Sequence, residues 1–213
     1  MIISYNGIES FRVQFGETTL SLGPISKSSK HKSSSFGADI VLVSLNHPDM
    51  NGADTASRGE KEPFVISGPG EYEVAGVRIK GLPSKSEYGG TVAINTVYLI
   101  ELEDMHLLYL GALGSTDLPQ ETKEAFDQVD ILFIPIGNEG VLNAVEAHKL
   151  GVSLEPSVII PMHYDTVGEK NALTTFLKEE GDGAIKPIDK LTVKRKDLAD
   201  KEGEVVVLEN KNS

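Results

Sequence analysis

The chain contains no cysteine, which excludes disulfide bonds, zinc–thiolate sites and thiol nucleophiles. It also has no apolar run approaching the roughly 18 residues that a membrane span requires. The first residues, Met1-Ile2-Ile3-Ser4-Tyr5, lack the basic segment and long apolar core of a secretory signal. We therefore expect a cytoplasmic protein with no membrane partner.

Basic residues are scarce relative to acidic ones. The sequence has 20 Lys and Arg against 32 Asp and Glu, a formal net charge of −12. A surface that binds nucleic acid must neutralise phosphates with Lys and Arg. The balance therefore argues against a nucleic-acid partner and is typical of a soluble acidic protein.

The hydrophobic pattern changes along the chain. The first half has short apolar or alternating segments, which predict strands at 11–15, 18–22, 40–43, 77–81, 91–101 and 107–110. The second half alternates predicted helices at 119–129, 141–150 and 172–180 with buried strands at 131–135 and 158–161. This order predicts two sheets packed face to face with helices outside, built from 213 residues around one core.

Three side chains suited to metal binding or proton transfer stand just after predicted buried strands: His47, Asp49 and His163. Imidazole and carboxylate groups bind zinc, manganese or iron, and imidazole also suits acid–base catalysis near neutral pH. Each residue also has a purely structural interpretation, because a histidine after a strand commonly makes only hydrogen bonds. Asp49 follows Pro48 and could cap its own turn.

The segment 26–35 is rich in serine and lysine and poor in apolar residues. We expect a solvated surface loop, because such a segment buries too little apolar area to order itself. The functional alternative is a flap that brings positive charge to an anionic ligand. His31 in this loop, and His106 and His148 elsewhere, are expected at the surface.

Five segments together resemble one known family. They are ADIVLVSLNHPDMN at 38–51, GPGEYEVAGVRI at 68–79, LGALG at 110–114, VDILFIPIG at 129–137 and VIIPMHY at 158–164. These resemble the metallo-β-lactamase fold, in the branch of Zn-dependent hydrolases related to the ascorbate-6-phosphate lactonases. The resemblance covers about residues 1–166. It implies an α/β (α+β) fold, a four-layer αβ/βα sandwich of two mixed β-sheets with helices outside, so we expect a single such domain over residues 1–213.

The resemblance also implies which positions would ligate two metal ions. His47 falls on a ligand of the first metal, and Asp49 and His163 fall on ligands of the second. The other implied ligand positions carry residues that cannot ligate in the same way: Ile8, Leu45, Met50, Ala112 and, near the fourth histidine position, Ser86. A catalytic zinc needs three protein ligands and an open position for water. Neither half of the implied site reaches three protein ligands. This indicates a site in which space-filling apolar side chains have replaced the metal ligands.

Three interpretations follow. The first is a non-catalytic binding or structural homologue of Zn-dependent hydrolases, with no metal expected and an unknown small-molecule or protein ligand. The alternative is a metal-dependent hydrolase of a phosphoester or lactone, with one zinc or manganese ion at His47, Asp49 and His163. The third is a metal-free catalyst in which Asp49 and His163 form a carboxylate–imidazole pair.

Overall fold

A computed structural model describes residues 1–57, 59, 62–126 and 128–212. One sheet has six strands in the order β12-β1-β2-β3-β4-β5. Its strands are β1 (Ile2–Tyr5), β2 (Phe11–Phe15), β3 (Thr18–Leu22), β4 (Ile40–Leu42), β5 (Phe64–Ile66) and β12 (Leu191–Thr192). Strands β3, β4 and β5 are parallel to one another and the other pairs are antiparallel, so the sheet is mixed.

The other sheet has seven strands in the order β13-β11-β10-β9-β8-β7-β6. Its strands are β6 (Gly70–Val74), β7 (Val77–Ser86), β8 (Ala93–Leu102), β9 (Met105–Tyr109), β10 (Ile131–Pro135), β11 (Val158–Met162) and β13 (Glu204–Val205). From β9 through β10 and β11 to β13 the strands are parallel, and the remaining pairs are antiparallel. All five residues of β10 and of β11 are buried, as expected for parallel strands covered on both faces.

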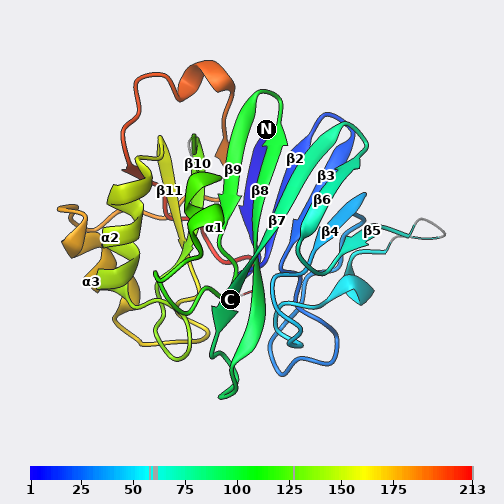
Figure 1. The fold of residues 1–213 in the computed structure, drawn as a ribbon, viewed down its shortest axis with the longest axis horizontal. Coiled ribbons are helices and arrows are strands. Elements are labelled where there is room, and N and C mark those ends of the chain that lie inside the picture. The colour runs from blue at the N-terminus through cyan, green and yellow to red at the C-terminus, as the bar shows by residue number, and fades with distance from the viewer. Residues whose placement is uncertain (58, 60–61, 127, 213) are drawn as a thin grey trace.

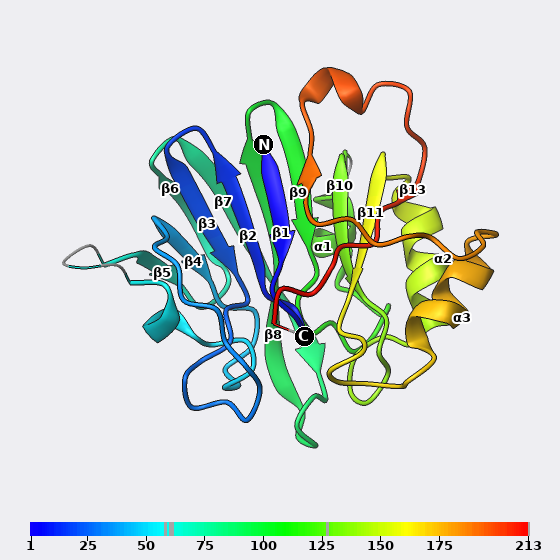
Figure 2. The same ribbon diagram turned by 180° about the vertical axis from the view of Figure 1, so that it is seen from behind.

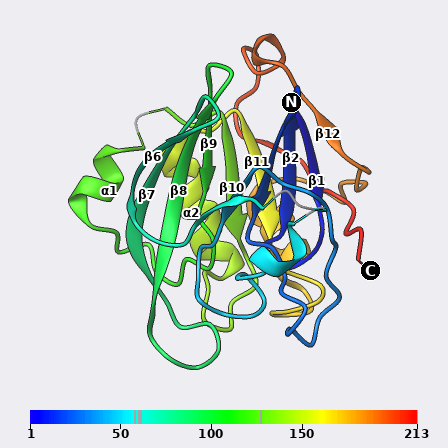
Figure 3. The same cartoon turned by 90° about the vertical axis from the view of Figure 1, so that its right-hand side faces the viewer.

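The two sheets pack face to face (Figure 3). A single large cluster of buried apolar side chains fills the space between them, including Phe11 of β2, Tyr109 of β9 and Phe133 of β10. The Phe11 and Phe133 rings meet edge to face with centroids 4.8 Å apart. Packing of this kind between the inner faces accounts for most of the apolar area that the fold removes from water. The predicted arrangement of two mixed sheets is confirmed.

The helices are α1 (Gln120–Glu124), α2 (Ala144–Leu154) and α3 (Ala172–Glu179), with short 3-10 helices η1 (Ala53–Thr55) and η2 (Arg195–Asp197). Helices α2 and α3 pack against each other beside β10 and β11 (Figures 1 and 2). Helix α2 begins later than the prediction of 141–150, because Asn143 caps it: its side chain accepts from the N–H of Glu146, and the Glu146 carboxylate accepts from the N–H of Asn143.

The predicted helix 119–129 is shorter in the structure, where α1 covers only Gln120–Glu124. Few apolar side chains of this segment reach the core, with Phe126 the largest of them. Packing of an apolar face, rather than intrinsic propensity, usually decides helix length, so a short helix follows. Within the described residues, no helix is long and apolar enough to cross a membrane.

The loops that follow the carboxyl ends of the parallel strands gather at one end of the sandwich, the lower end in Figure 1. They include the blue segment after β3, the turn after β4 and the yellow segment after β11. In sheets of this type, ligands bind where these strand ends meet. This end of the molecule is therefore where the predicted site residues belong.

Candidate functional site

The turn after β4 places its side chains in two directions. Beyond the buried strand, the Thr96 N–H of β8 donates to the Ser44 carbonyl at 2.7 Å, which joins the chain to the second sheet. The Met50 and Asn51 N–H groups both donate to the His47 carbonyl at 2.9 Å and close a tight turn. Leu45 and Met50 point into the interior and are 3% and 0% exposed. His47 and Asp49 lie between them in sequence but face a cavity.

The positions that the family resemblance assigns to missing ligands come together in one place. We call this set the packed cluster: Ile8, Ile25, Leu45, Met50, Ala112 and Val141, with Tyr88, Ala93 and Val167 packed against it. Four of its members, Ile8, Leu45, Met50 and Ala112, are the residues that stand where the resemblance implies a metal ligand. Their contact is therefore apolar, and charge could not be placed among them without a large desolvation cost.

The loop that carries Ala112 is held firmly although residue 112 has no carboxylate. The side chain of Asn95, fully buried in β8, accepts from the Ala112 N–H at 2.9 Å and donates to the Leu110 carbonyl at 2.9 Å. Ser86, the other substituted position, is also fully buried, and its hydroxyl accepts from the Tyr88 N–H at 3.2 Å. These contacts are structural, and they direct the Tyr88 ring toward the predicted site residues.

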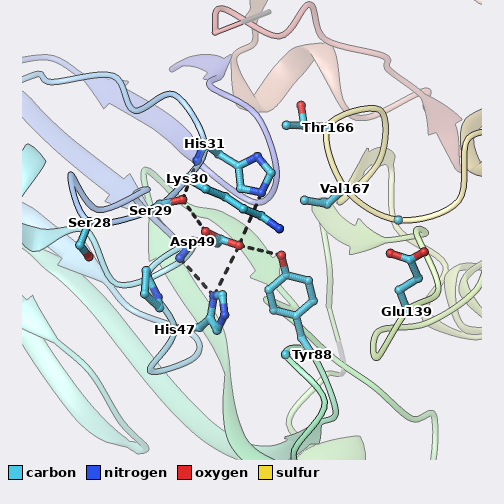
Figure 4. Close-up of a pocket in the computed structure, with 13 residues that line it drawn as sticks. Ser28, Ser29, Lys30, His31, His47, Asp49, Tyr88, Glu139, Thr166 and Val167 are labelled. Atoms are coloured by element: carbon cyan, nitrogen blue, oxygen red, sulfur yellow. Dashed lines mark hydrogen bonds and ion pairs between the residues drawn. The ribbon is translucent and has the colours of Figure 1, made fainter.

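A second set of side chains surrounds Asp49, which we call the polar cluster: Ser29, His31, His47, Asp49 and Tyr88 (Figure 4). The Ser29 hydroxyl donates to Asp49 Oδ1 at 2.5 Å, and the Tyr88 hydroxyl donates to Oδ2 at 2.7 Å. His47 Nδ1 lies 3.5 Å and His31 Nε2 3.9 Å from the same Oδ2. The Asp49 N–H also donates to His47 Nδ1 at 3.2 Å.

Asp49 carries the negative charge of the polar cluster. Burial acts to raise the pKa of Asp49, but the hydrogen bonds from Ser29 and Tyr88 and the neighbouring His47 and His31 more than offset it, so the pKa is lowered. Burial and the bond to Asp49 raise the pKa of Tyr88. Asp49 is thus a carboxylate at neutral pH and Tyr88 a neutral phenol that donates to it.

The serine- and lysine-rich loop lies against this cluster rather than standing free in solvent. The Ser26 N–H donates to the Pro48 carbonyl at 2.8 Å, which fixes the loop to the turn after β4. Ser29 holds Asp49 and also accepts from the His31 N–H at 3.0 Å. The expectation that His31 is a solvated surface residue is wrong, since its side chain is 13% exposed. The signal available in the sequence was the serine two positions before His31, a spacing that favours a local side-chain turn.

His163 lies at the end of β11 and is fully buried, and its partner is Glu9 rather than Asp49. His163 Nδ1 and Glu9 Oε1 are 2.7 Å apart, and neither side chain is exposed. The Ser44 hydroxyl lies 3.4 Å from the other Glu9 oxygen. His163 Nε2 is buried without a hydrogen-bond partner. The predicted pairing of Asp49 with His163 is therefore wrong, because the carboxylate beside His163 is that of Glu9, 154 residues away in sequence.

The backbone around His163 depends on a glycine. His163 has φ 60°, a left-handed conformation that residues with a side chain seldom adopt. A Cβ at Gly137, after β10, would stand 2.0 Å from the His163 carbonyl oxygen. Gly137 thus permits the close approach of two strand ends.

The ring of Tyr88 separates the predicted site residues into two groups. It makes an edge-to-face contact with His47 and another with His163, each with ring centroids 4.9 Å apart. His47 and Asp49 are neighbours on one side of the ring, and His163 with Glu9 lies on the other. The structure therefore brings two of the three predicted residues together and places the third behind an aromatic side chain.

The polar cluster opens into a cavity of about 610 Å³. Its walls include Lys30, His31 and His47 on one side and Glu139, Thr166 and Val167 across from them (Figure 4). This size suits a small molecule. Tyr88 and Glu139 were not among the predicted site residues, because nothing in their local sequence marks them. Lys30 was predicted only as part of a loop that could bring positive charge to an anionic ligand.

The side chains present do not fit a catalytic metal centre as they are placed. Across the described parts of the chain, no group of three His, Asp or Glu side chains could hold a metal ion. His47 Nδ1 accepts from the Asp49 N–H. His163 binds Glu9 through Nδ1, which leaves its Nε2 free, but the Tyr88 ring packs against both imidazoles. Zinc requires nitrogen or oxygen ligands within about 2.2 Å of one point, and this arrangement provides no such point for the three predicted residues.

Comparisons with known proteins agree on the family. A model described as the beta-lactamase superfamily domain matches residues 2–163. A protein named UPF0173 metal-dependent hydrolase from Thermococcus onnurineus is 30% identical over 152 residues, covering 61% of this chain and 68% of its own length. A protein of the same name from Pelotomaculum thermopropionicum is 28% identical over 167 residues, covering 64% and 72%.

A solved structure from Thermotoga maritima is similar over nearly the whole chain. It has a TM-score of 0.74 and 26% identity, and the match covers 97% of each chain. That protein is provisionally named a Zn-dependent hydrolase of the metallo-beta-lactamase superfamily. The names of these relatives support the predicted hydrolase alternative better than the predicted non-catalytic homologue, and they do not support the expectation that no metal binds.

Proposed function

The chain belongs to the beta-lactamase superfamily, and we propose that within it this protein binds a small ligand in the cavity beside Asp49 without a two-metal centre. On this proposal the fold of a hydrolase is retained and its metal chemistry is not. The cavity, the polar cluster and the strand ends around them form the binding site, within one domain over residues 1–213.

One observation carries the proposal: the substituted ligand positions pack against one another. Isolated loss of a ligand would leave a polar gap that water or another metal ligand could occupy. Here Ile8, Leu45 and Met50 fill the space together and are at most 3% exposed. Close packing of this kind stabilises the fold by removing apolar area from water, and it would be lost if an ion entered.

The surviving side chains also have new partners. Asp49 accepts from Ser29 and Tyr88, and His163 Nδ1 pairs with Glu9, so both side chains have protein partners without a cation, while His163 Nε2 stays unpaired. Buried polar groups are stable only when they are paired in this way. These pairings support a site that holds its shape in the absence of metal.

The second candidate is a metal-dependent hydrolase of a phosphoester or lactone. The names of the relatives favour it, and so does the closeness of His47 and Asp49. It would use a zinc or manganese ion at His47, Asp49 and His163, which requires Tyr88 to leave its place between the two imidazoles. It also requires His163 to turn its free Nε2 toward the ion.

Metal content distinguishes the two candidates. Protein purified without chelator should contain less than about a tenth of an equivalent of any transition metal, because a true zinc site binds too tightly for purification to strip it. Added zinc or manganese should leave the thermal midpoint unchanged, since a ligand stabilises only the state that binds it. About one equivalent of metal, or a midpoint that rises by several degrees, would favour the hydrolase instead.

A matched variant gives this experiment a positive control. The triple substitution Leu45→His, Met50→His and Ala112→Asp restores three of the ligand types that the family resemblance implies. If its circular dichroism shows that it folds, it should take up zinc where the natural chain does not. Metal uptake by both proteins would contradict the proposal.

A further inference from the structure

The carboxylate of Asp49 already has its hydrogen-bond partners on the protein side of the cavity. Each of its oxygens accepts a hydroxyl hydrogen bond, one from Ser29 and one from Tyr88, and two imidazoles lie within 4 Å of Oδ2, at 3.5 and 3.9 Å. Its side chain is only 4% exposed. A ligand that enters the cavity therefore meets the groups around Asp49 more than the carboxylate itself.

Those surrounding groups are able to donate hydrogen bonds or carry positive charge. Lys30 lines the cavity, and within the described ranges its ammonium has no ion-pair partner. In Figure 4 its side chain extends between His31 and Tyr88. The ε edge of the His47 ring also reaches the cavity wall, next to Gly89.

His31 provides a second and independent indication of a ligand. Its Nε2 atom is buried and has no hydrogen-bond partner, and the distance of 3.9 Å to Asp49 Oδ2 is too long for a direct bond. A buried nitrogen without a partner is uncommon in folded proteins and is usually satisfied by water, an ion or a ligand. His31 lines the same cavity as Lys30.

The far wall of the cavity is different in character. It consists of Glu139 and the segment Thr166, Val167 and Gly168. Glu139 is exposed and carries the only other acidic side chain of the lining. An anionic group would therefore lie against Lys30, His31 and His47 and away from Glu139.

We propose that Lys30, His31 and His47 bind the oxyanion of a small ligand, a phosphate or a carboxylate group, in the cavity beside Asp49. This inference rests on the proposed ligand-binding function and adds the chemical class of the ligand. It also assigns a role to the serine- and lysine-rich loop: Ser29 ties the loop to Asp49, and the next two residues face the anion.

Titration calorimetry with inorganic phosphate, and separately with acetate, tests the proposal at constant ionic strength. We expect phosphate or acetate to bind in the millimolar range, and the ion that binds more tightly identifies the group. Lys30→Ala should weaken this binding about tenfold, because a charge-assisted hydrogen bond is lost. High salt should weaken it as well, since Lys30 is exposed to screening.

Two further variants make the test specific. Lys27→Ala removes the same charge from the same loop but outside the cavity lining, so it should leave the affinity unchanged. Glu139→Gln removes the negative charge across the cavity and should raise the affinity, by roughly twofold on the scale of a weak, solvent-screened interaction. Absence of binding by both anions, or equal loss in Lys30→Ala and Lys27→Ala, would overturn the proposal.

The titration also separates this inference from the proposed function. Repeating it with chelator present should not alter the affinity if side chains alone hold the anion. Anion binding that disappears with chelator would mean that a metal holds the anion, which overturns both statements. Absence of anion binding in a protein without metal overturns only the present inference.

Discussion

The packed cluster and the polar cluster begin at the same turn, yet they differ in almost every physical respect. Leu45 and Met50 enter a dry group of apolar side chains, whereas His47 and Asp49 border a cavity of about 610 Å³. The first group is stabilised by burial and close packing, and the second by hydrogen bonds and charge. A turn of a few residues thus separates a region that contributes to stability from one that can contact a ligand.

The comparison bears on the proposed loss of metal chemistry at this site. Ile8, Leu45, Met50 and Ala112, at positions where the family resemblance implies ligands, fill the interior side. On the solvent side Asp49 has Ser29, His31 and Tyr88 as neighbours. Three predictions test how far this division holds.

The largest loss of stability is expected at the Glu9–His163 pair, which is fully buried. Glu9→Ala would leave His163 with neither ring nitrogen paired in a fully buried position. Removing one partner of a fully buried carboxylate–imidazole pair should cost on the order of 3 to 5 kcal/mol, the scale for breaking a buried ion pair, and urea unfolding should show a loss of that size. Glu17→Ala, at an exposed acid, should change little. A loss below about 1 kcal/mol for Glu9→Ala would show that this buried polar pair contributes little to the stability of the fold.

An intermediate effect is expected within the packed cluster. Met50→Ala would leave a cavity at a fully buried position and should lower the free energy of unfolding by about 2 to 4 kcal/mol. His47→Ala, three residues away with a side chain 33% exposed, should cost less than about 1 kcal/mol. Equal losses of unfolding free energy in the two variants, measured by the same urea titration, would contradict the proposed difference between the two clusters.

The smallest effect is a dependence of stability on pH that comes from Asp49. Its pKa is lowered in the folded state, so the carboxylate contributes stability above its unfolded value, near pH 4. That contribution is lost as pH falls through the lower folded value. The difference in unfolding free energy between the natural chain and Asp49→Asn should therefore be constant at neutral pH and shrink below about pH 4.

Asp165 provides the control of opposite sign. Burial raises its pKa, so its charged form destabilises the folded state above that value. Asp165→Asn should slightly increase stability at neutral pH and have no effect in acid. A difference for Asp49→Asn that grows as the pH falls would show that its carboxylate is not held by the polar cluster.

Much of the fold follows from local patterns. Strands β10 and β11 are continuous apolar segments, and the structure buries all their residues within a parallel sheet. The ends of α1 could not be predicted in the same way. The sequence can indicate that a helix forms here, but its length depends on how many side chains reach the core.

The site was predictable only in part, because its decisive contacts join distant residues. His47 and Asp49 share a turn, so their closeness follows from sequence. The pairing of His163 with Glu9 joins the end of β11 to a turn near the start of the chain, and no local sequence pattern encodes this pairing. The position of Tyr88 between the two imidazoles likewise depends on the hairpin β7–β8 as a whole.

The side chain of Asn95 affects how many changes would be needed to turn this chain into a metal-binding one. By accepting from the Ala112 N–H and donating to the Leu110 carbonyl, it fixes the main chain of the loop after β9 through contacts that do not involve the side chain of residue 112. A carboxylate introduced at this position would therefore find the main chain in place, and its cost would be desolvation among the apolar side chains of the packed cluster.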